Sequence, residues 1–152
     1  MLKEGDKLPL FDRLNQKGEA LKSEQFIGKK PLVVFFYPKN FTPGCTAEVC
    51  SFRDKYADFL EYGAEVIGVS VDSVRSHERF ASSFNLPYSL LSDSDKSLQK
   101  AFKINPQFFG VLTRRVTFVF DKEGKLTLAH DSLNPISHIH KALKALKSET
   151  FV

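Results

Sequence analysis

Two largely apolar segments, residues 32–37 and 66–71, do most to restrict how this chain can fold. They read LVVFFY and VIGVSV and are rich in β-branched and aromatic residues. Such runs are typical of strands buried on both faces, which occur in sheets that helices cover on two sides. We therefore expect two central strands in a layered α/β domain.

Helical patterns follow both segments. A helix is predicted to run from a cap at Ser73 to about Phe84, after the second segment. Residues 88–91 and 95–102 predict a short strand and a short helix. Residues 45–61, after the first segment, predict a helix with one apolar stripe, made of Val49, Phe52, Tyr56 and Phe59.

The two ends of the chain complete the pattern. Residues 9–14 and 19–22 predict an N-terminal β-hairpin, and residues 116–120 and 125–129 predict a second hairpin. Strands that alternate with helices and end in a hairpin and a helix favour a thioredoxin-like α/β fold, with a central mixed β-sheet flanked by helices. No linker or repeat divides residues 1–152, so we predict a single domain. The last helix, from about Pro135, is predicted to bury Ile136, Ile139, Leu143 and Leu146.

The charge pattern argues against nucleic-acid and membrane partners. The net charge is +4, but the 22 basic residues are scattered among 18 acidic ones, as on an ordinary solvated surface. No apolar run reaches the roughly 18–20 residues that span a bilayer. The first residues lack a signal or transit character, which predicts a cytoplasmic location, although a mature form that has lost a presequence would look the same.

Cys45 and Cys50 are the two cysteines of the chain, and Cys45 opens the predicted helix 45–61 directly after Thr42-Pro43-Gly44. Helix N-termini favour negative charge and are among the places where the pKa of a thiol falls. A thiolate is the nucleophilic form of cysteine. In a reducing compartment, two such cysteines indicate catalysis or redox sensing more than a structural disulfide.

Cys45 lies on the buried stripe, and burial alone opposes thiolate formation. The candidates that could outweigh burial are the helix N-terminus and a nearby cation. Strand alternation lets only one of Arg114 and Arg115 face Cys45, and periodicity leaves open which one. Thr42 either offers its hydroxyl to the sulfur or to a bound oxygen, or is simply a turn residue. Pro38 and Pro43 stiffen the loop before the helix.

The spacing of Cys45 and Cys50 bears on whether they can pair. In an intact helix, residues five apart have Cα atoms about 8–9 Å from each other, beyond the roughly 7 Å limit for a disulfide. Pairing would therefore require the first turns of the helix to unwind. This suggests a two-state cycle, with the helix folded for attack on a substrate and locally unfolded for disulfide formation.

Plainer interpretations compete with catalysis. Cysteines on a helix are often inert packing residues, and Cys50 taken alone fits that description. A zinc site is not expected, because no suitable histidine pair accompanies the cysteines. His138 and His140 lie about 200° apart on a helix, so they cannot share a metal and are expected on a solvated flank. His77 and His130 form no recognisable constellation.

The whole pattern resembles the peroxiredoxins, in particular the bacterioferritin comigratory protein or PrxQ group. The resemblance spans about Lys7 to Leu146, and the x₄ spacing of the cysteines marks the subgroup. The stretch 105–112 varies among such proteins, and its role stays open. The matching pieces are Pro38-x-x-x-Thr42-x-x-Cys45, Cys50, Gly68 to Ser73, Leu90 to Asp93, and Arg115-Val116-Thr117-Phe118.

This resemblance implies a thioredoxin-dependent peroxidase that reduces hydrogen peroxide and organic hydroperoxides in antioxidant defence. It implies that Cys45 is the peroxidatic and Cys50 the resolving cysteine, which form an intramolecular disulfide, and it selects Arg115 over Arg114. It implies no metal, haem or flavin. Because an in-chain disulfide removes the need for a dimer, we expect a monomer, with a weak dimer left open. Further pocket residues implied are Thr42, Pro38, Pro43, Gly44 and Glu48, the last orienting Arg115.

Two rival functions remain on the same residues. A thiol–disulfide oxidoreductase is disfavoured because the expected Cys-x-x-Cys is replaced by Cys-x₄-Cys. A redox-switched holdase would use the unwinding helix to expose Phe52, Tyr56 and Phe59. Turnover of peroxide separates the peroxidase from both.

Overall fold

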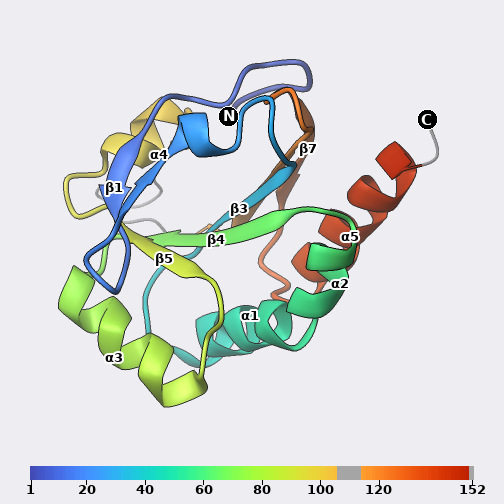
Figure 1. Ribbon diagram of the computed structural model, residues 1–152. Helices are drawn as coiled ribbons and strands as arrows, with labels where there is room; N and C mark the ends of the chain where they lie inside the picture. Colours follow the sequence, from blue (N-terminus) through green and yellow to red (C-terminus); the bar gives the residue numbers. More distant parts are fainter. Residues whose placement is uncertain (106–113, 151–152) are drawn as a thin grey trace.

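The computed structural model describes residues 1–105 and 114–150, with side chains described up to Ser148. Within these ranges, a five-stranded mixed sheet forms the centre of the molecule, in the order β5-β4-β3-β6-β7 (Figure 1). β3 and β4, and β4 and β5, run parallel, whereas β6 and β7 are antiparallel to their neighbours. The strands are β3 (Leu32–Phe36), β4 (Glu65–Ser70), β5 (Ser89–Ser92), β6 (Val116–Phe120) and β7 (Leu126–Asp131).

The central strand β3 is buried on both faces, as predicted. Alternate side chains join two separate apolar cores. Val33 and Phe35 face the core under the larger helices, where Phe35 stacks on Phe52 with ring centroids 4.2 Å apart. Val34 and Phe36 face the second core. The predicted α/β layering is therefore confirmed.

The helix predicted over residues 45–61 is two helices, so its prediction as one element is wrong. α1 (Pro43–Asp54) and α2 (Tyr56–Glu61) are separated at Lys55, whose backbone leaves helical geometry. No glycine or proline marks the break, so periodicity could not reveal it. The stripe nevertheless continues across it, because Phe52 and Phe59 are both fully buried.

The remaining helices lie on both sides of the sheet. α3 (Val74–Phe84) is capped by the Ser73 side chain, as predicted. α5 (Ser137–Thr150) packs with α1 and α3 on one face, and α4 (Ser97–Ala101) and the short 3₁₀ helix η1 (Ser23–Gln25) lie over the other.

The stripe predicted for the last helix is partly wrong. Ile136 is 42% exposed, because it lies in the turn before α5 rather than within the helix. Ile139 and Leu146 are buried as predicted, but Ala142 lies between them where Leu143 was expected, and Leu143 is only partly buried. The helix is therefore rotated relative to the prediction.

The N-terminal hairpin is present as predicted. β1 (Asp12–Leu14) pairs with β2 (Ala20–Lys22) in a separate two-stranded sheet. It is tied to the main sheet by Gln16, whose side chain bonds the backbone of Tyr88 and Leu90 at the β5 edge. Among the helices of the described ranges, none is long and apolar enough to cross a bilayer.

Candidate active site

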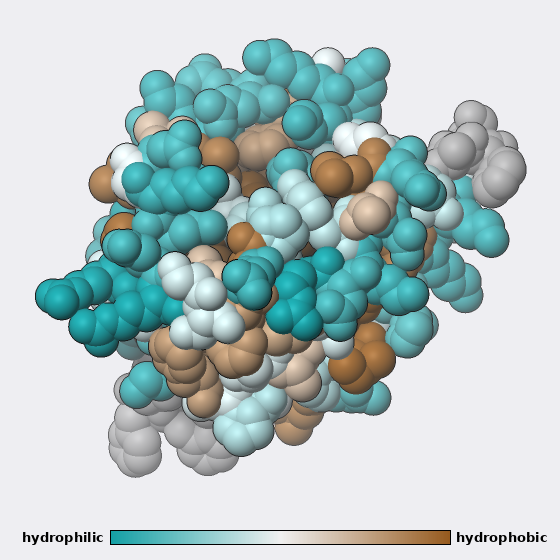
Figure 2. All heavy atoms as spheres, turned by 60° about the horizontal axis from the view of Figure 1, so that its bottom comes forward, coloured by the Kyte–Doolittle hydropathy of each residue, from teal (hydrophilic) through white to brown (hydrophobic). Residues whose placement is uncertain are grey.

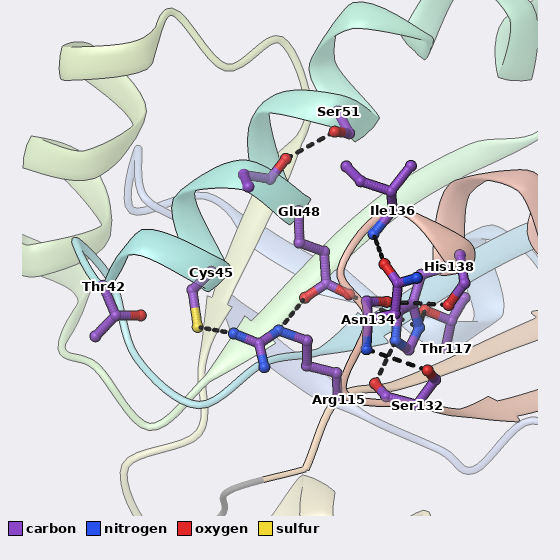
Figure 3. Close-up of polar contacts among 12 residues, drawn as sticks. Thr42, Cys45, Glu48, Ser51, Arg115, Thr117, Ser132, Asn134, Ile136 and His138 are labelled. Carbon is purple, nitrogen blue, oxygen red and sulfur yellow. Dashed lines mark hydrogen bonds and ion pairs between the residues drawn. The ribbon is translucent and has the colours of Figure 1, made fainter.

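Cys45 lies in the first turn of α1, with its sulfur turned toward the sheet (Figure 3). The helix begins at Pro43, whose fixed φ suits the first helical position and whose missing N–H costs no hydrogen bond there. Cys45 is 1% exposed and packs in the apolar core that contains Val49 and Phe52. The thiol is therefore held at the positive end of a helix and away from bulk water.

Arg115 is the cation beside this sulfur. Its Nη2 lies 3.5 Å from the Cys45 Sγ, and the guanidinium is mostly buried between α1 and the sheet. Gly44 makes this approach possible, because a Cβ at position 44 would collide with Arg115 Nη2. Arg114 instead pairs with Asp131 on β7. The structure thus resolves the choice that strand periodicity left open.

Glu48, one helical turn beyond Cys45, stands behind Arg115. Its side chain is fully buried, and its Oε1 lies 3.6 Å from Arg115 Nε. Neither carboxyl oxygen has a hydrogen-bond partner among the described residues. Burial raises the pKa of Glu48 to about 8, and the nearby Arg115 charge only partly opposes that rise. Near neutral pH the group therefore carries a proton in a large share of molecules.

His138 lies on the far side of Glu48 and completes a row of four side chains, namely Cys45, Arg115, Glu48 and His138. Its Nδ1 lies 3.7 Å from Glu48 Oε2, and the ring is fully buried. The ring also bonds the Thr117 hydroxyl and the Ser132 carbonyl. Burial lowers the pKa of His138 to about 4. The prediction that His138 lies on a solvated flank is wrong, because α5 is rotated so that His138 packs against β6.

A second polar cluster fixes the loop between β3 and α1. The Tyr37 hydroxyl donates to Asn40 Oδ1 at 2.6 Å, and the Asn40 backbone N–H donates to Asp72 at 2.9 Å. The Asn40 side-chain amide also bonds Ser76 and His77 at 3.1 and 3.0 Å. His77, like His138, is fully buried. The loop that leads to Cys45 is therefore anchored to α3 and to the end of β4.

Thr42 is the residue that precedes α1, and its hydroxyl donates to the Lys39 carbonyl at 2.9 Å. In this arrangement it does not donate to Cys45, and it makes no side-chain cap to the helix. Its role in binding substrate stays a prediction. Beside it, Phe41 is 53% exposed, adopts a φ of 66°, and packs edge-on against Phe80.

Apolar residues reach the surface on this side of the molecule, among a majority of hydrophilic ones (Figure 2). Phe41 and Ile136 are two of the large apolar side chains that remain exposed.

Cys50 lies in the middle of α1, and both cysteines are free thiols. It is partly exposed, and burial raises the pKa of its thiol, with Arg53 and Asp54 acting in opposite directions. Cys50 therefore stays protonated at neutral pH while the helix is folded.

The AhpC/TSA family model matches residues 4–129. Chloroplastic peroxiredoxin Q of Sedum lineare is 42% identical over 145 residues, which is 95% of this chain and 77% of that protein. The corresponding protein of Populus jackii is also 42% identical, over 95% of this chain and 68% of its own length. This chain belongs to the peroxiredoxin Q group of the AhpC/TSA family.

Solved peroxiredoxin structures show the same fold. Peroxidoxin BcpB from Mycobacterium tuberculosis superposes with a TM-score of 0.90 at 34% identity, over 97% of this chain and 98% of that one. The bacterioferritin comigratory protein of Xanthomonas campestris, whose structures were reported for its alkyl peroxide reduction activity, gives a TM-score of 0.85 at 31% identity. This superposition covers 95% of this chain and 99% of the Xanthomonas campestris chain. The predicted thioredoxin-like fold of this peroxiredoxin is confirmed.

The structure brings most of the predicted site residues together around the start of α1. Pro38 opens the anchored loop and Pro43 opens the helix, whereas Gly44 and Glu48 both touch the Arg115 side chain. Cys50 lies apart from this group, further along the same helix. Of the stretch 105–112, whose role the sequence left open, residues 106–112 lie outside the described residues.

Sequence reasoning missed His138 and the cluster around Asn40 and His77. Strand alternation puts Thr117 on the same side of the strand as Arg115, which is one signal for the His138 position. No local pattern predicted that three segments of the chain would meet at Asn40.

In the parts of the chain that the structure describes, no group of three or more histidine, cysteine, aspartate or glutamate side chains could hold a metal ion.

Proposed function

We propose that this peroxiredoxin is a thiol-dependent peroxidase in which Cys45 attacks the hydroperoxide. The single observation that carries the assignment is the contact between the buried Cys45 sulfur and Arg115 at the N-terminus of α1. A fixed guanidinium and a helix N-terminus both favour the thiolate over the thiol. Both also favour negative charge as it moves to the leaving oxygen.

The first step transfers one oxygen atom. The Cys45 thiolate attacks the terminal oxygen of R–O–OH, the O–O bond breaks, and the S–O bond forms. The leaving RO⁻ takes up a proton and departs as the alcohol, or as water when R is hydrogen. Cys45 is left as a sulfenic acid, the first stage of thiol oxidation.

Cys50 then resolves the sulfenic acid. Its sulfur attacks the Cys45 sulfur, water leaves, and an intramolecular disulfide results. Because both residues lie within α1, their Cα atoms are about 8–9 Å apart, too far for a disulfide. The first turns of α1 must therefore unwind during this step, which removes Cys45 from Arg115.

A dithiol of the thioredoxin type is proposed as the reductant. Its thiolate attacks the disulfide, and a second exchange releases both thiols of this chain. For the oxidant, the half-exposed Phe41 beside Thr42 offers apolar surface near the site, which favours organic hydroperoxides alongside hydrogen peroxide. The alkyl peroxide activity named for the Xanthomonas campestris relative points the same way.

A coupled assay with thioredoxin, thioredoxin reductase and hydroperoxide tests this function. The wild type should turn over many times, whereas Cys45→Ser should be inactive. Cys50→Ser should reduce one equivalent of peroxide and then stop. Failure of the wild type to consume peroxide would contradict the proposal and leave the holdase alternative. Full turnover by Cys50→Ser with thioredoxin would reject Cys50 as the resolving residue.

The assembly and location of the protein stay predictions. An in-chain disulfide works without a second subunit, so we expect a monomer, with a weak dimer left open. We expect a cytoplasmic location, whereas the relatives from Sedum lineare and Populus jackii are named chloroplastic. Fractionation of the source cells tests the location.

A further inference from the structure

The two halves of α1 are tied to the rest of the molecule in different ways. In the first half, Cys45 and Glu48 contact the Arg115 guanidinium at 3.5 and 3.6 Å. The contact at the sulfur depends on charge, and that charge is lost when the thiolate becomes a protonated sulfenic acid. Reaction with peroxide therefore loosens the first half of the helix.

The second half of α1 is held by short hydrogen bonds that do not involve Cys45. The hydroxyl of Tyr88, the residue before β5, donates to the Val49 carbonyl at 2.6 Å. Arg53 Nη1 donates to the carbonyl of Phe84, the last residue of α3, at 2.8 Å. A carbonyl oxygen can only accept, so the direction of both bonds is fixed. Oxidation of Cys45 changes neither of them.

Tyr88 is itself firmly placed, so it can serve as an anchor. Its side chain is 2% exposed, and its ring meets Phe35 of the central strand edge-on, with centroids 5.9 Å apart. Its carbonyl accepts from the Gln16 side-chain amide at 3.0 Å. The second half of α1 is therefore tied through Tyr88 to both the main sheet and the N-terminal hairpin.

The anchored carbonyl lies at a decisive place in the helix, directly before Cys50. If residues 43–48 unwind, the remaining helix runs only from Val49 to Asp54, which is fewer than two turns. A helix this short does not persist in water without tertiary contacts. The Tyr88 bond lies at the start of this piece and the Arg53 bond close to its end.

The geometry lets Cys45 move to Cys50 while the second half stays in place. Helical side chains tilt toward the N-terminus, so the Cys50 sulfur is directed to the turns that unwind. Four residues of extended chain span up to about 13–14 Å, so the segment between Cys45 and Val49 is long enough for Cys45 to come back within disulfide distance of Cys50.

We infer that Tyr88 is a positioning residue for the resolving step: its bond to Val49 persists while residues 43–48 unwind, and so holds Cys50 where Cys45 can reach it. The inference rests on the peroxidase function proposed above, because it takes Cys50 as the resolving residue. In this step the Cys50 sulfur attacks the Cys45 sulfenic sulfur, the S–O bond breaks, and the hydroxyl group leaves as water with the proton of the Cys50 thiol.

The substitution Tyr88→Phe tests the inference, because it removes the bond to Val49 and keeps the buried ring. The variant should fold, since the Val49 carbonyl keeps its intrahelical bond from the Arg53 N–H. Oxidation of Cys45 should proceed at the wild-type rate. Disulfide formation should slow by about three- to tenfold, as expected when one hydrogen bond that orders Cys50 is lost. Rapid quenching, alkylation and mass spectrometry resolve the two steps.

Tyr56→Phe is the matched control. It removes a tyrosine hydroxyl bond of the same kind, 2.7 Å long, but to Glu65 on β4 and from outside α1. It should form the disulfide at the wild-type rate. Equal slowing in the two variants would overturn the inference. Faster disulfide formation in Tyr88→Phe would also overturn it, since the bond would then restrain unwinding instead of outlasting it.

A second readout separates positioning from general destabilisation. With excess peroxide, a sulfenic acid that waits longer for Cys50 accepts a second oxygen atom and becomes a sulfinic acid, while the peroxide leaves as an alcohol or water. Tyr88→Phe should therefore divert a larger share of Cys45 to the sulfinic acid in each turnover. A variant that melts earlier but keeps the wild-type share would mark a merely structural role.

Hydrogen exchange of the wild type keeps the test valid if Tyr88→Phe does not fold. The amides of Arg53 and Asp54 bond back to residues 49 and 50, so in the disulfide form they should stay as protected as in the reduced protein. The amides of residues 47–52, whose partners lie within 43–48, should exchange faster. Loss of protection at Arg53 and Asp54 would overturn the inference.

Failure of the underlying function gives different results. If peroxide leaves Cys45 unmodified, the peroxidase function fails. If Cys45 is oxidised but no disulfide with Cys50 forms in the wild type, the resolving role of Cys50 fails. A wild-type rate of disulfide formation in Tyr88→Phe, in a protein that turns over normally, refutes only the role of Tyr88.

Discussion

Two polar clusters flank the N-terminus of α1, and they are built differently. The cluster around Asn40, with Tyr37, Asp72 and His77, joins its members by hydrogen bonds of 2.6 to 3.0 Å. The row of Cys45, Arg115, Glu48 and His138 is held by contacts of 3.5 to 3.7 Å. Most members of both clusters are buried, and each cluster contains a fully buried histidine.

The difference shows how rigidity and charge are divided in this site. Short, directional hydrogen bonds fix the loop that carries the residues before Cys45. The longer contacts depend mainly on charge, whose strength in a dry interior changes with each proton gained or lost. The Asn40 cluster therefore sets where the cysteine lies, and the Arg115 row sets how charged it is.

The sharpest way to break this comparison is to remove the cation. Arg115→Leu should lower the rate of peroxide reduction by about 10²- to 10³-fold, the usual loss when one stabilising charge is removed from a reaction centre. The matched control is Arg114→Leu, which removes the neighbouring arginine that pairs with Asp131 instead of Cys45. Stopped-flow oxidation with limiting peroxide measures both. Equal losses in the two variants would contradict the assignment.

A smaller change to the same row displaces the guanidinium without removing it. In Gly44→Ala, the added methyl group occupies the space of Arg115 Nη2, so Arg115 must turn away from the sulfur. We expect a loss of about tenfold in the same assay, because the charge remains nearby but is poorly placed. The fold should persist, since alanine suits the first turn of a helix. An unchanged rate would show that the close approach is not needed.

A substitution in the Asn40 cluster should lower the folding stability and leave the charge on Cys45 nearly unchanged. Asn40→Ala removes bonds to Tyr37, Ser76 and His77 and leaves buried polar groups unpaired. Such a loss costs about 1–3 kcal/mol, or roughly 2–12 °C in the melting temperature of a chain of this size. The thiolate titration of the folded protein should change little. A large shift of that titration, with no loss of stability, would reverse the roles of the two clusters.

The sequence predicted the two clusters unequally, for physical reasons. Cys45 follows from a local rule, the start of a helix. Arg115 and Glu48 follow from the resemblance to the peroxiredoxins, because strand alternation left the choice between Arg114 and Arg115 open. The Asn40 cluster joins β3, the end of β4 and α3, segments that meet only once the sheet has formed. The prediction for His138 was wrong because its burial depends on the rotation of α5 about its axis. Small residues such as Ala142 permit this rotation, but they do not predict it.

The break between α1 and α2 at Lys55 was not predicted either, because it depends on tertiary contacts. The apolar stripe of residues 45–61 is real, yet two helices share it. Side chains near the break are bound to other elements: Arg53 donates to the Phe84 carbonyl, and the Tyr56 hydroxyl donates to Glu65. Periodicity reports which face is buried, whereas tertiary contacts decide where a helix ends.

The pH dependence of the folding stability should distinguish the two clusters, because the Arg115 row contains Glu48. Its folded pKa, about 8, is raised above the ordinary value of 4.5, so the wild type loses stability as pH rises from about 4.5 to 8. Glu48→Gln lacks this loss, because it has no proton to release. The variant should therefore gain on the wild type over that window, by up to about 5 kcal/mol or about 10–20 °C, because each pKa unit corresponds to about 1.4 kcal/mol.

Melting curves at pH 5 and pH 9 measure this difference. The comparison cancels the buried histidines, which both proteins share. A difference between variant and wild type that is the same at both pH values would show that Glu48 already carries its charge in the folded protein at pH 5.

The smallest expected effect concerns Cys50, outside both clusters. Burial raises the pKa of its thiol, Arg53 lowers it and Asp54 raises it further. Asp54→Asn should therefore ease deprotonation of Cys50 and speed disulfide formation about twofold near neutral pH, whereas oxidation of Cys45 by peroxide is unaffected. Stopped-flow detection of the second kinetic phase measures this step. If Asp54→Asn leaves the second phase unchanged across pH, Cys50 loses its protons only after α1 has unwound, and the charges beside it in the folded helix do not govern resolution.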